Sequence, residues 1–437
     1  MRLMYISILF YVFSFTQIYA QGNWVKQNSP TSDQFYKAVY TDTTNIWVCG
    51  GNGTIIHTSN GGLNWFKQNT NTDFQILSMS FINNRLGWAI ANKLNYANPV
   101  IYKTTNGGNN WNYTDYPDTN LIFYDICFLD SLYGFISGNS GLFLRTTNGG
   151  LNWRSGKMDT TIFSNLSIRN IFPVNKKIIY GCGGQMDIAG MVWKSEDSGK
   201  NFTSKIIAPE PITKLIKLDS VIIIGTGGDY EFGASLVKTT SSGLNWIYDP
   251  IPYFGIGFDI AVRTKTEWWI GLGFSNMLTY TTNSGINWNS VQMPDSSGIY
   301  QIIFPDSLHG WAFGTYGSIY RYYKTTSSVT NNENNLPKTF KLNQNYPNPF
   351  NSSTIIRFSL PENGKSENGK WKMENGLVTL KVFDILGKEI AILVNEKLRP
   401  GTYEKPFSNN HLPSGIYFYQ LLYENKIIDA KIFVILK

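Results

Sequence analysis

The sequence predicts an all-β protein, and three observations support this fold class. The 437 residues include 40 Gly, 13 Trp and 26 Tyr, a composition rich in strand formers and in residues that punctuate turns. Short runs of alternating apolar and polar residues, such as 88–90 and 101–103, recur between clusters of Gly and Asn. After residue 20, no stretch keeps the apolar period of a helix over three turns. We therefore expect little helix.

The first 20 residues are expected to be a secretory signal peptide. Arg2 provides the positive end, an apolar run follows, and Ala20 is the small residue before the expected cleavage. An uncleaved membrane anchor is the alternative, because the apolar run approaches the roughly 18 residues that a span needs, but Thr16 and Gln17 weaken it. No Cys stands at the cleavage point, so lipid attachment is not expected. After cleavage, we expect no integral membrane segment.

Charge and cysteine content argue against several classes of partner and site. The formal net charge is +7, but the Lys and Arg residues are scattered and form no stripe, which argues against nucleic acid as a partner. The three cysteines, Cys49, Cys127 and Cys182, are odd in number and lie in apolar strand patterns. We expect them to be buried side chains and to form neither a disulfide framework nor a metal site.

One short phrase recurs six times and defines the architecture. Its pattern is Ser/Thr-x-Asp/Asn-x-Gly-x-x-Trp/Phe, and successive copies begin 42 to 49 residues apart, the size of one four-stranded propeller blade. Only the fourth copy has the acid, Asp197, and the fifth has Ser241 at that place. The defining residues of the copies are Thr58, Asn60, Gly62 and Trp65; Thr104, Asn106, Gly108 and Trp111; Thr146, Asn148, Gly150 and Trp153; Ser195, Asp197, Gly199 and Phe202; Thr239, Gly243 and Trp246; and Thr281, Asn283, Gly285 and Trp288.

The chemistry of the phrase is structural. A short hydroxyl or carboxamide side chain can hydrogen-bond its own turn, and Gly at the fifth place can take a positive φ without the roughly 1 kcal/mol penalty of other residues. The closing Trp or Phe can then pack between neighbouring sheets, where truncation to Ala would cost roughly 3 to 5 kcal/mol. We therefore assign the phrase to folding and not to ligand binding.

A seventh unit is incomplete, and the start of the chain supplies what it lacks. Strand patterns within 302–326 are not followed by the Gly-x-x-Trp half of the phrase. Residues 23–27 nearly duplicate residues 64–68, the strand after the first complete phrase. We therefore predict that the strand with Trp24 is the outer strand of the last blade and closes a seven-bladed β-propeller over residues 21–326.

On these phrases the chain resembles proteins with Asp-box (BNR) repeats. The Gly-Trp or Gly-Phe strands between the phrases are similar to those of propellers of the photosystem II assembly factor type, and the resemblance covers residues 21–326. In such relatives the phrase is a scaffold feature, so the resemblance implies a fold and no activity.

A second domain is predicted after a linker. Residues 327–338 are polar and without periodicity. Residues 339–437 contain about six alternating strands separated by Gly, Pro and Asn turns, enough for a small antiparallel β-sandwich. On this pattern alone, a carbohydrate-binding or spacer module is an alternative assignment. The polar insertion at 363–376 is expected to be a surface loop.

Three motifs of this domain carry a second resemblance. They lie at residues 340–351, 382–389 and 412–417, and together they resemble the type A C-terminal sorting domain of the type IX secretion system. The resemblance implies passage through the inner membrane by the signal peptide and recognition of residues 339–437 by the secretion machinery at the outer membrane. It further implies release or surface attachment after removal of the domain.

An enzyme is not predicted, because no catalytic constellation is visible. A sialidase-like glycoside hydrolase is the enzymatic alternative, since sialidases also carry Asp boxes, but its chemistry needs three convergent Arg side chains and a Tyr/Glu pair. No serine or cysteine nucleophile with a matching base is visible, and no metal or cofactor is predicted. The propeller arginines, which form no recognisable triad, are Arg85, Arg145, Arg154, Arg169, Arg263 and Arg321.

Binding of a protein or a glycan by a monomer is the predicted function. Loops joining the second and third strands emerge opposite the Asp-box hairpins, and those at 92–99, 184–190 and 228–233 are long. The alternatives are solvated loops without a ligand, or a structural surface component or adhesin. The candidate ligand surface comprises Tyr96, Met186, Asp187, Tyr230, Glu231 and Phe232.

Overall fold

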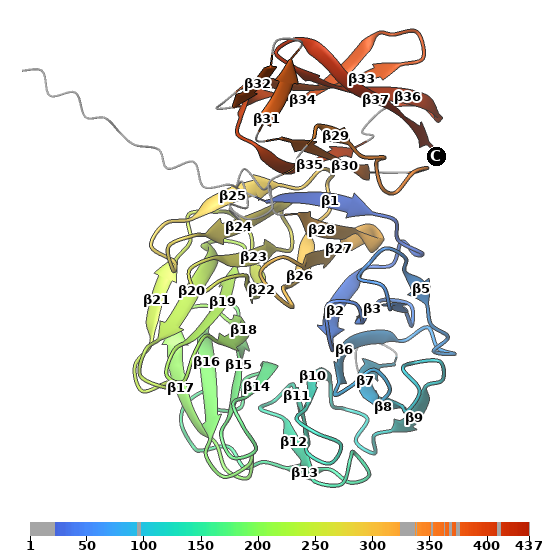
Figure 1. Ribbon diagram of the computed structural model, residues 1–437. Helices are drawn as coiled ribbons and strands as arrows, with labels where there is room; N and C mark the ends of the chain where they lie inside the picture. The colour runs from blue at the N-terminus through green and yellow to red at the C-terminus, as the bar shows by residue number, and fades with distance from the viewer. Residues whose placement is uncertain are drawn as a thin grey trace, which may run out of the picture.

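Seven four-stranded antiparallel sheets are arranged around a central axis, as Figure 1 shows. The computed structural model describes residues 22–93, 98–323, 337, 339–350, 353–361, 363–366, 369–372, 376–408 and 412–436. Within each of the first six blades, the strands follow one another from the axis outward in chain order. The predicted seven-bladed propeller is therefore confirmed, whereas the predicted signal peptide at 1–20 lies outside the described residues.

The blades are numbered here in chain order. Blades 1 to 4 contain β2 (Phe35–Tyr40), β3 (Ile46–Gly50), β4 (Ile55–Thr58), β5 (Phe66–Lys67); β6 (Gln75–Phe81), β7 (Gly87–Asn92), β8 (Pro99–Thr104), β9 (Asn112–Asp115); β10 (Phe123–Phe128), β11 (Gly134–Gly138), β12 (Phe143–Thr146), β13 (Arg154–Ser155); and β14 (Ile168–Pro173), β15 (Ile179–Gln185), β16 (Ala189–Ser195), β17 (Thr203–Ala208). Blades 5 to 7 contain β18 (Ile212–Lys217), β19 (Ile223–Asp229), β20 (Gly233–Thr239), β21 (Ile247–Pro250); β22 (Gly257–Val262), β23 (Trp268–Leu272), β24 (Met277–Thr281), β25 (Asn289–Gln292); and β26 (Ile299–Ile303), β27 (Gly310–Gly314), the 3₁₀ turn η2 (Thr315–Gly317), β28 (Ile319–Tyr323) and β1 (Asn23–Gln27).

The N-terminal strand closes the ring. β1 pairs antiparallel with β28, and Trp24 stands opposite Tyr322 in the register. The buried Trp24 ring meets Trp269 and Phe304 edge-on, with centroids 5.5 and 5.8 Å apart. Because β1 completes the last sheet, blade 7 has the same four strands as the others, and the predicted closure is confirmed.

A polar clasp supports this closure. Lys26 Nζ lies 2.5 Å from Asp295 Oδ2, and the Tyr320 hydroxyl donates a hydrogen bond to the same carboxylate. Burial alone would raise the pKa of Asp295, but the hydrogen bonds from Lys26, Ser297 and Tyr320 lower it from 3.8 to about 2. The first strand and the last strand of the ring are therefore held by one ionised carboxylate.

The six Asp-box hairpins share one hydrogen-bond pattern. The hydroxyl of the first residue accepts the N–H of the fifth-place Gly at 2.9–3.1 Å. The side-chain oxygen at the third place accepts the N–H four residues further on at 2.9–3.0 Å. Each turn thus provides acceptors for its own backbone N–H groups, as the sequence chemistry predicts.

Each hairpin also braces the preceding blade. Trp47 Nε1 of β3 donates to Gly107 O in the next blade at 3.0 Å, and Trp88 Nε1 of β7 donates to Gly149 O at 3.2 Å. Gly62 has φ +78°, and a Cβ there would lie 2.5 Å from Trp311 Nε1. Glycine is therefore needed in this turn for two reasons, the positive φ and the close approach of the indole.

The C-terminal sheets share a separate core. One sheet has the order β34-β33-β36-β37 and another β29-β30-β35, and Phe358, Leu380 and Phe433 from the two sheets are fully buried together. Figure 1 shows β30 and β35 next to β1 of the propeller. The strands are β29 (Lys341–Leu342), β30 (Ser353–Leu360), β31 (Asn363–Ser366), β32 (Gly369–Lys372), β33 (Gly376–Asp384), β34 (Glu389–Leu398), β35 (Gly401–Ser408), β36 (Gly415–Tyr423) and β37 (Lys426–Ile435).

The insertion at 363–376 differs from the expected surface loop. Its described residues form a two-stranded hairpin, β31 paired with β32. The short polar sequence lacks an apolar alternation, so its pairing was not visible as a strand pattern. In the described part of the chain, no helix has the length and apolar character that crossing a membrane requires.

We expect Thr58→Val to destabilise the propeller by about 1–3 kcal/mol, because the buried Gly62 N–H loses its acceptor while the side-chain shape is kept. Chemical denaturation monitored by tryptophan fluorescence measures this change. Thr58→Ser is the matched control, since the fourth copy has Ser195 at this place and uses its hydroxyl in the same way. Equal losses in the two variants would contradict the role of the hydroxyl.

We expect Asp295→Asn to lower the free energy of unfolding at neutral pH and to change its pH dependence. A carboxyl with a lowered pKa stabilises the fold above its unfolded value of 3.8, and the contribution is lost as the pH falls towards 2. The difference between wild type and variant should therefore shrink between about pH 5 and pH 2. A difference that stays constant over this range would show that ionised Asp295 does not support closure.

Candidate functional site at the mouth of the ring

A β-bulge interrupts the innermost strand of every blade. In each first strand, the register with the second strand shifts over one residue, which is left outside the ladder. A bulge of this kind re-aims a side chain. The seven re-aimed residues, one from each blade, are Tyr36, Leu77, Tyr124, Arg169, Thr213, Phe258 and Tyr300.

These seven side chains line a cavity of about 600 Å³, called here the mouth. It lies on the face of the ring where the second and third strands of each blade are joined, opposite the Asp-box hairpins. In blade 4, for example, the start of β14 pairs with the end of β15, next to the turn into β16. Gln34, Gln75 and Phe274 also line it. The mouth therefore combines aromatic rings with planar polar side chains.

The residue after each bulge forms the floor of the mouth. A second hollow of about 410 Å³ lies on the other side and shares Lys37, Lys214, Asp259 and Gln301 with the first, so the floor separates the two. The seven floor residues are Lys37, Ser78, Asp125, Asn170, Lys214, Asp259 and Gln301.

One half of the floor is organised by Asp125. Its carboxylate lies 3.1 Å from Lys37 Nζ and accepts hydrogen bonds from Ser78 at 2.6 Å and from the Asn170 amide at 2.7 Å. Burial alone would raise the pKa of Asp125, but the facing lysines, Lys37 and Lys214, lower it. Burial alone would lower the pKa of Lys37, yet the two floor carboxylates raise it. Lys37 and Asp125 therefore form a charged pair inside the ring.

The other half is organised by Asp259. Lys214 Nζ lies 3.8 Å from its carboxylate, while the Gln301 amide and the backbone N–H of Ile302 donate to it. Burial and the neighbouring Lys37 lower the pKa of Lys214, and burial raises the pKa of Asp259. Two lysines and two aspartates make the floor close to neutral in sum.

Only part of the predicted ligand surface lies near the mouth. Met186 and Asp187 lie in the turn between β15 and β16, and Tyr230, Glu231 and Phe232 in the turn between β19 and β20. The extra length of these hairpins is paired strand and not irregular loop. Tyr230 lies beside the mouth, because its ring centroid is 4.8 Å from that of the lining residue Phe274. Tyr96 lies outside the described residues.

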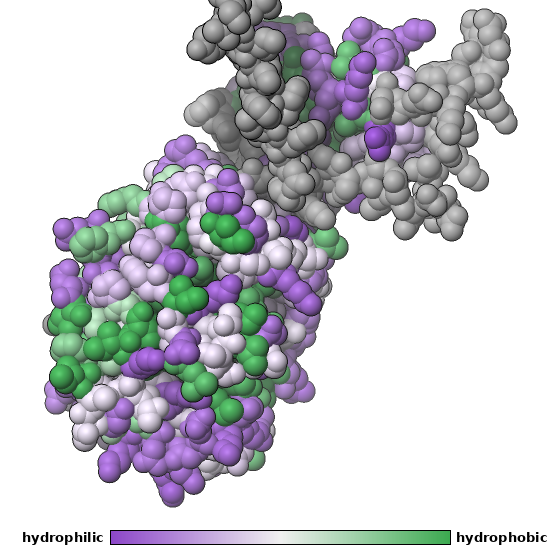
Figure 2. Space-filling view, turned by 90° about the vertical axis from the view of Figure 1, so that its left-hand side faces the viewer, coloured by the Kyte–Doolittle hydropathy of each residue, from purple (hydrophilic) through white to green (hydrophobic). Residues whose placement is uncertain are grey.

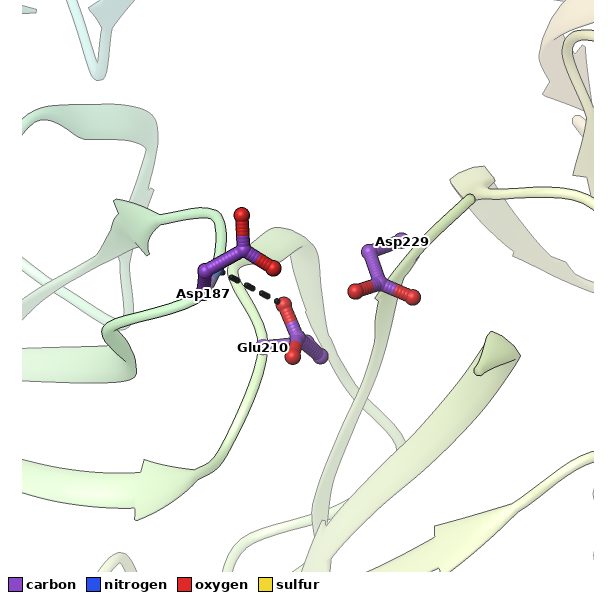
Figure 3. A group of neighbouring side chains, drawn as sticks. All are labelled: Asp187, Glu210 and Asp229. Carbon is purple, nitrogen blue, oxygen red and sulfur yellow. Dashed lines mark hydrogen bonds between the residues drawn. The ribbon is translucent and has the colours of Figure 1, made fainter. Parts of the chain in front are cut away.

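Asp187 belongs instead to a group of three carboxylates, drawn in Figure 3 with Glu210 and Asp229. Their oxygens lie within 4.8 Å of one another, and the Asp187 N–H donates to Glu210 at 3.4 Å. Burial raises the pKa of Glu210, and Asp229 accepts the backbone N–H groups of Glu231 and Phe232 at 2.9 and 2.6 Å. Carboxylate oxygens suit a hard cation. Asp229, however, already accepts the hydrogen bonds that hold the turn containing Tyr230.

Sequence reasoning missed the seven bulge residues and the floor. A signal for them exists, because each first strand has a polar residue at the same place, directly before an apolar one, as in Phe123-Tyr124-Asp125-Ile126. The six propeller arginines are dispersed, and Arg169 is the one that lines the mouth among the described lining residues. His57 stacks on Trp47 with centroids 4.3 Å apart, and burial lowers its pKa to about 4.

The outer rim offers apolar surface and one further hollow of about 630 Å³, which lies between β1 of the propeller and β30 and β35 of the sorting domain. Figure 2 views the ring from the side of β17 and β21 and shows apolar side chains in several patches separated by polar ones. Ile206 on β17 and Ile247 on β21 are both about half exposed, at 50% and 53%. The mouth is lined by residues of all seven blades, whereas the hollow beside β1 needs the sorting domain for one of its walls, so the mouth is the stronger candidate for a site that belongs to the propeller.

Sequence comparison defines the class of protein. Residues 344–435 match the family described as the secretion system C-terminal sorting domain. The chain is thus an exported β-propeller protein, whose sorting domain directs it across the outer membrane to the cell surface or the medium by the type IX system.

The propeller has distant relatives. The photosystem II stability/assembly factor HCF136 of Arabidopsis thaliana is 22% identical over 309 residues, which cover 63% of this chain and 72% of that protein. Among solved structures, YCF48 bound to a D1 peptide has a TM-score of 0.57 at 20% identity and covers 70% of this chain and 97% of its own. YCF48 from Cyanidioschyzon merolae has a TM-score of 0.56 at 17% identity, with 69% and 98% covered.

A glycosidase propeller is similar in fold as well. The GH74 xyloglucanase from Xanthomonas campestris has a TM-score of 0.55 at 10% identity and covers 77% of this chain and 59% of its own. At these identities the likeness shows the fold alone.

We expect Asp125→Asn to destabilise the protein by roughly 3–5 kcal/mol, because Lys37 loses its close buried counter-ion. Combining it with Lys37→Met should cost less than the sum of the two single changes, since no unpaired charge remains. Denaturant midpoints of the two single variants and the double variant test this coupling. Lys176→Met, which removes the exposed pair with Asp130, is the control and should change the midpoint little. Strict additivity in the floor would refute the pair.

Proposed function

We propose that this protein is an exported, non-catalytic binding protein that takes its ligand in the mouth of the ring. The observation that carries the proposal is the bulge repeated in all seven innermost strands, which aims seven side chains at one hollow. A bulge removes a residue from the ladder, and bulges are enriched where a side chain must be redirected for function. The volume, about 600 Å³, is within the usual range of ligand pockets.

The charges of the floor support a binding role without catalysis. Asp125 and Asp259 each lie beside a lysine and accept hydrogen bonds within the floor, which supports a structural role for these two carboxylates. Arg169 lines the mouth without two further arginines among the described lining residues, so a sialidase-like carboxylate clamp finds no support there.

The relatives support ligand binding by this fold but do not identify the class of ligand. One similar propeller is described as bound to a D1 peptide, and another is a xyloglucanase. Export brings this chain to the outer cell surface or the medium, where both polypeptides and glycans are accessible. The mouth is the feature through which either would be held.

We expect the purified protein to bind members of an array of outer-surface proteins and glycans through the mouth. Arg169→Ala and Tyr300→Ala should each weaken binding at least about tenfold, because each removes a lining contact worth about 1.4 kcal/mol or more. Surface plasmon resonance with the array hit measures the affinity. Ile206→Ala on the outer rim is the control and should leave it unchanged. Binding that survives both mouth variants would show that the ligand is held elsewhere on the chain, and no binding at all would favour a passive surface component.

A further inference from the structure

Four aromatic rings from three blades form a continuous shelf, and three of them, Phe258, Phe274 and Tyr300, line one side of the mouth. Tyr230 of blade 5 contacts Phe274, which contacts Phe258 in the same blade 6, which contacts Tyr300 of blade 7. The centroid distances along this series are 4.8, 5.4 and 4.6 Å. Neighbouring rings are inclined by 43° to 67°, so their faces point in different directions along the shelf.

The shelf is fixed by the backbone around it. A Cβ added to Gly273 would lie 2.4 Å from the Phe258 ring and 3.0 Å from the Tyr300 ring, so glycine leaves the space in which these rings sit. Asp229 accepts two backbone N–H groups of the turn that presents Tyr230. The rings are thus held in place before any ligand arrives, which lowers the ordering cost of binding.

The outer part of the shelf is open to solvent. Tyr230 and Phe274 are 51% and 50% exposed, although each is packed against an aromatic neighbour. Exposed aromatic surface in a hollow marks a ligand contact more often than isolated exposed residues do. Aromatic faces carry partial negative charge and attract C–H groups, whose hydrogens are slightly positive.

The polar groups beside the shelf are planar hydrogen-bonding side chains. Gln34, Gln75 and Arg169 line the mouth, and Gln301 lies in its floor. Amide and guanidinium groups offer donors and acceptors in fixed pairs, the arrangement that suits two neighbouring hydroxyls. The two lysines of the floor are matched by two aspartates, so Arg169 is the one charge of the described mouth lining that lies outside these pairs.

These features fit a sugar chain better than a polypeptide. A pyranose ring presents an apolar C–H face to an aromatic ring and hydroxyls at its edge. A peptide anchor is instead a side chain that needs a deep, desolvated apolar pocket, whereas the deepest part of this mouth is the polar floor.

We propose that the mouth binds a neutral oligosaccharide, stacked on the shelf of Tyr230, Phe274, Phe258 and Tyr300 and hydrogen-bonded by Gln34, Gln75 and Arg169. This inference rests on the proposed function, because it names the ligand class of the same site. The chain would then be a surface or secreted lectin-like protein that recognises neutral sugar units without cleaving them.

Isothermal titration of the purified full chain with cellohexaose, xylohexaose, mannohexaose and maltohexaose tests the proposal. We expect at least one hexasaccharide to bind, and Tyr230→Ala and Phe274→Ala each to weaken that binding at least about tenfold. Phe274→Tyr should retain affinity, whereas Phe274→Leu should lose it, because leucine is apolar but has no aromatic face. Both rings are about half exposed, so the variants should remain folded, and thermal unfolding checks this.

Phe66→Ala is the matched control, since this ring is 64% exposed on β5, the outermost strand of blade 1, and should have no effect on binding. Failure of all four sugars to bind would overturn the sugar assignment. If array proteins bind and the mouth variants weaken them, the proposed function stands and only the sugar assignment fails. If a hexasaccharide binds equally well to the Tyr230 and Phe274 variants, the shelf is not the site.

Discussion

Closure of the ring by β1 is the constraint on which the rest of the molecule depends. The strand that begins the described chain pairs with β28, so the last blade gains its outer strand and Trp24 fills the space between blades 6 and 7. With the circle complete, the seven inner strands surround one axis, so residues at the same place in each strand point towards the same space. Without closure, the Lys26 and Asp295 clasp and the convergence of the bulges would both be lost.

The same repetition serves two purposes at opposite ends of the strands. At one end the Asp-box hairpins brace blade against blade, with Thr or Ser hydroxyls and glycines at positive φ satisfying each turn. At the other end the bulges turn aromatic and polar side chains into the mouth. Structural and candidate binding residues are therefore segregated along the axis, which allows the mouth to vary while the scaffold stays constant.

Much of the fold could be predicted from the sequence, because its causes are local. The Asp-box phrase encodes a turn within eight residues, and its spacing gives the blade size, so blade number and closure by Trp24 followed without a structure. The sorting domain was recognised from short motifs. The hairpin at 363–376 was not predicted, because the segment lacks apolar alternation, although its Asn368-Gly369 step is a hairpin turn signal. Tyr230 was selected as a long-hairpin residue, but its stacking on Phe274 depends on the neighbouring blade.

The sequence by itself determined the blade count, the turn chemistry, the partner of the first strand and the export route, since each is written in contiguous residues or in their repetition. Only the tertiary structure decided the mouth. A shift of one residue in strand pairing reverses the side to which a side chain points. Such shifts therefore decide whether the bulge residues face a core or an open hollow, as they do for Tyr36, Tyr124, Phe258 and Tyr300. The pairing of Lys37 with Asp125 is likewise a property of the closed circle, because it joins the inner strands of blades 1 and 3.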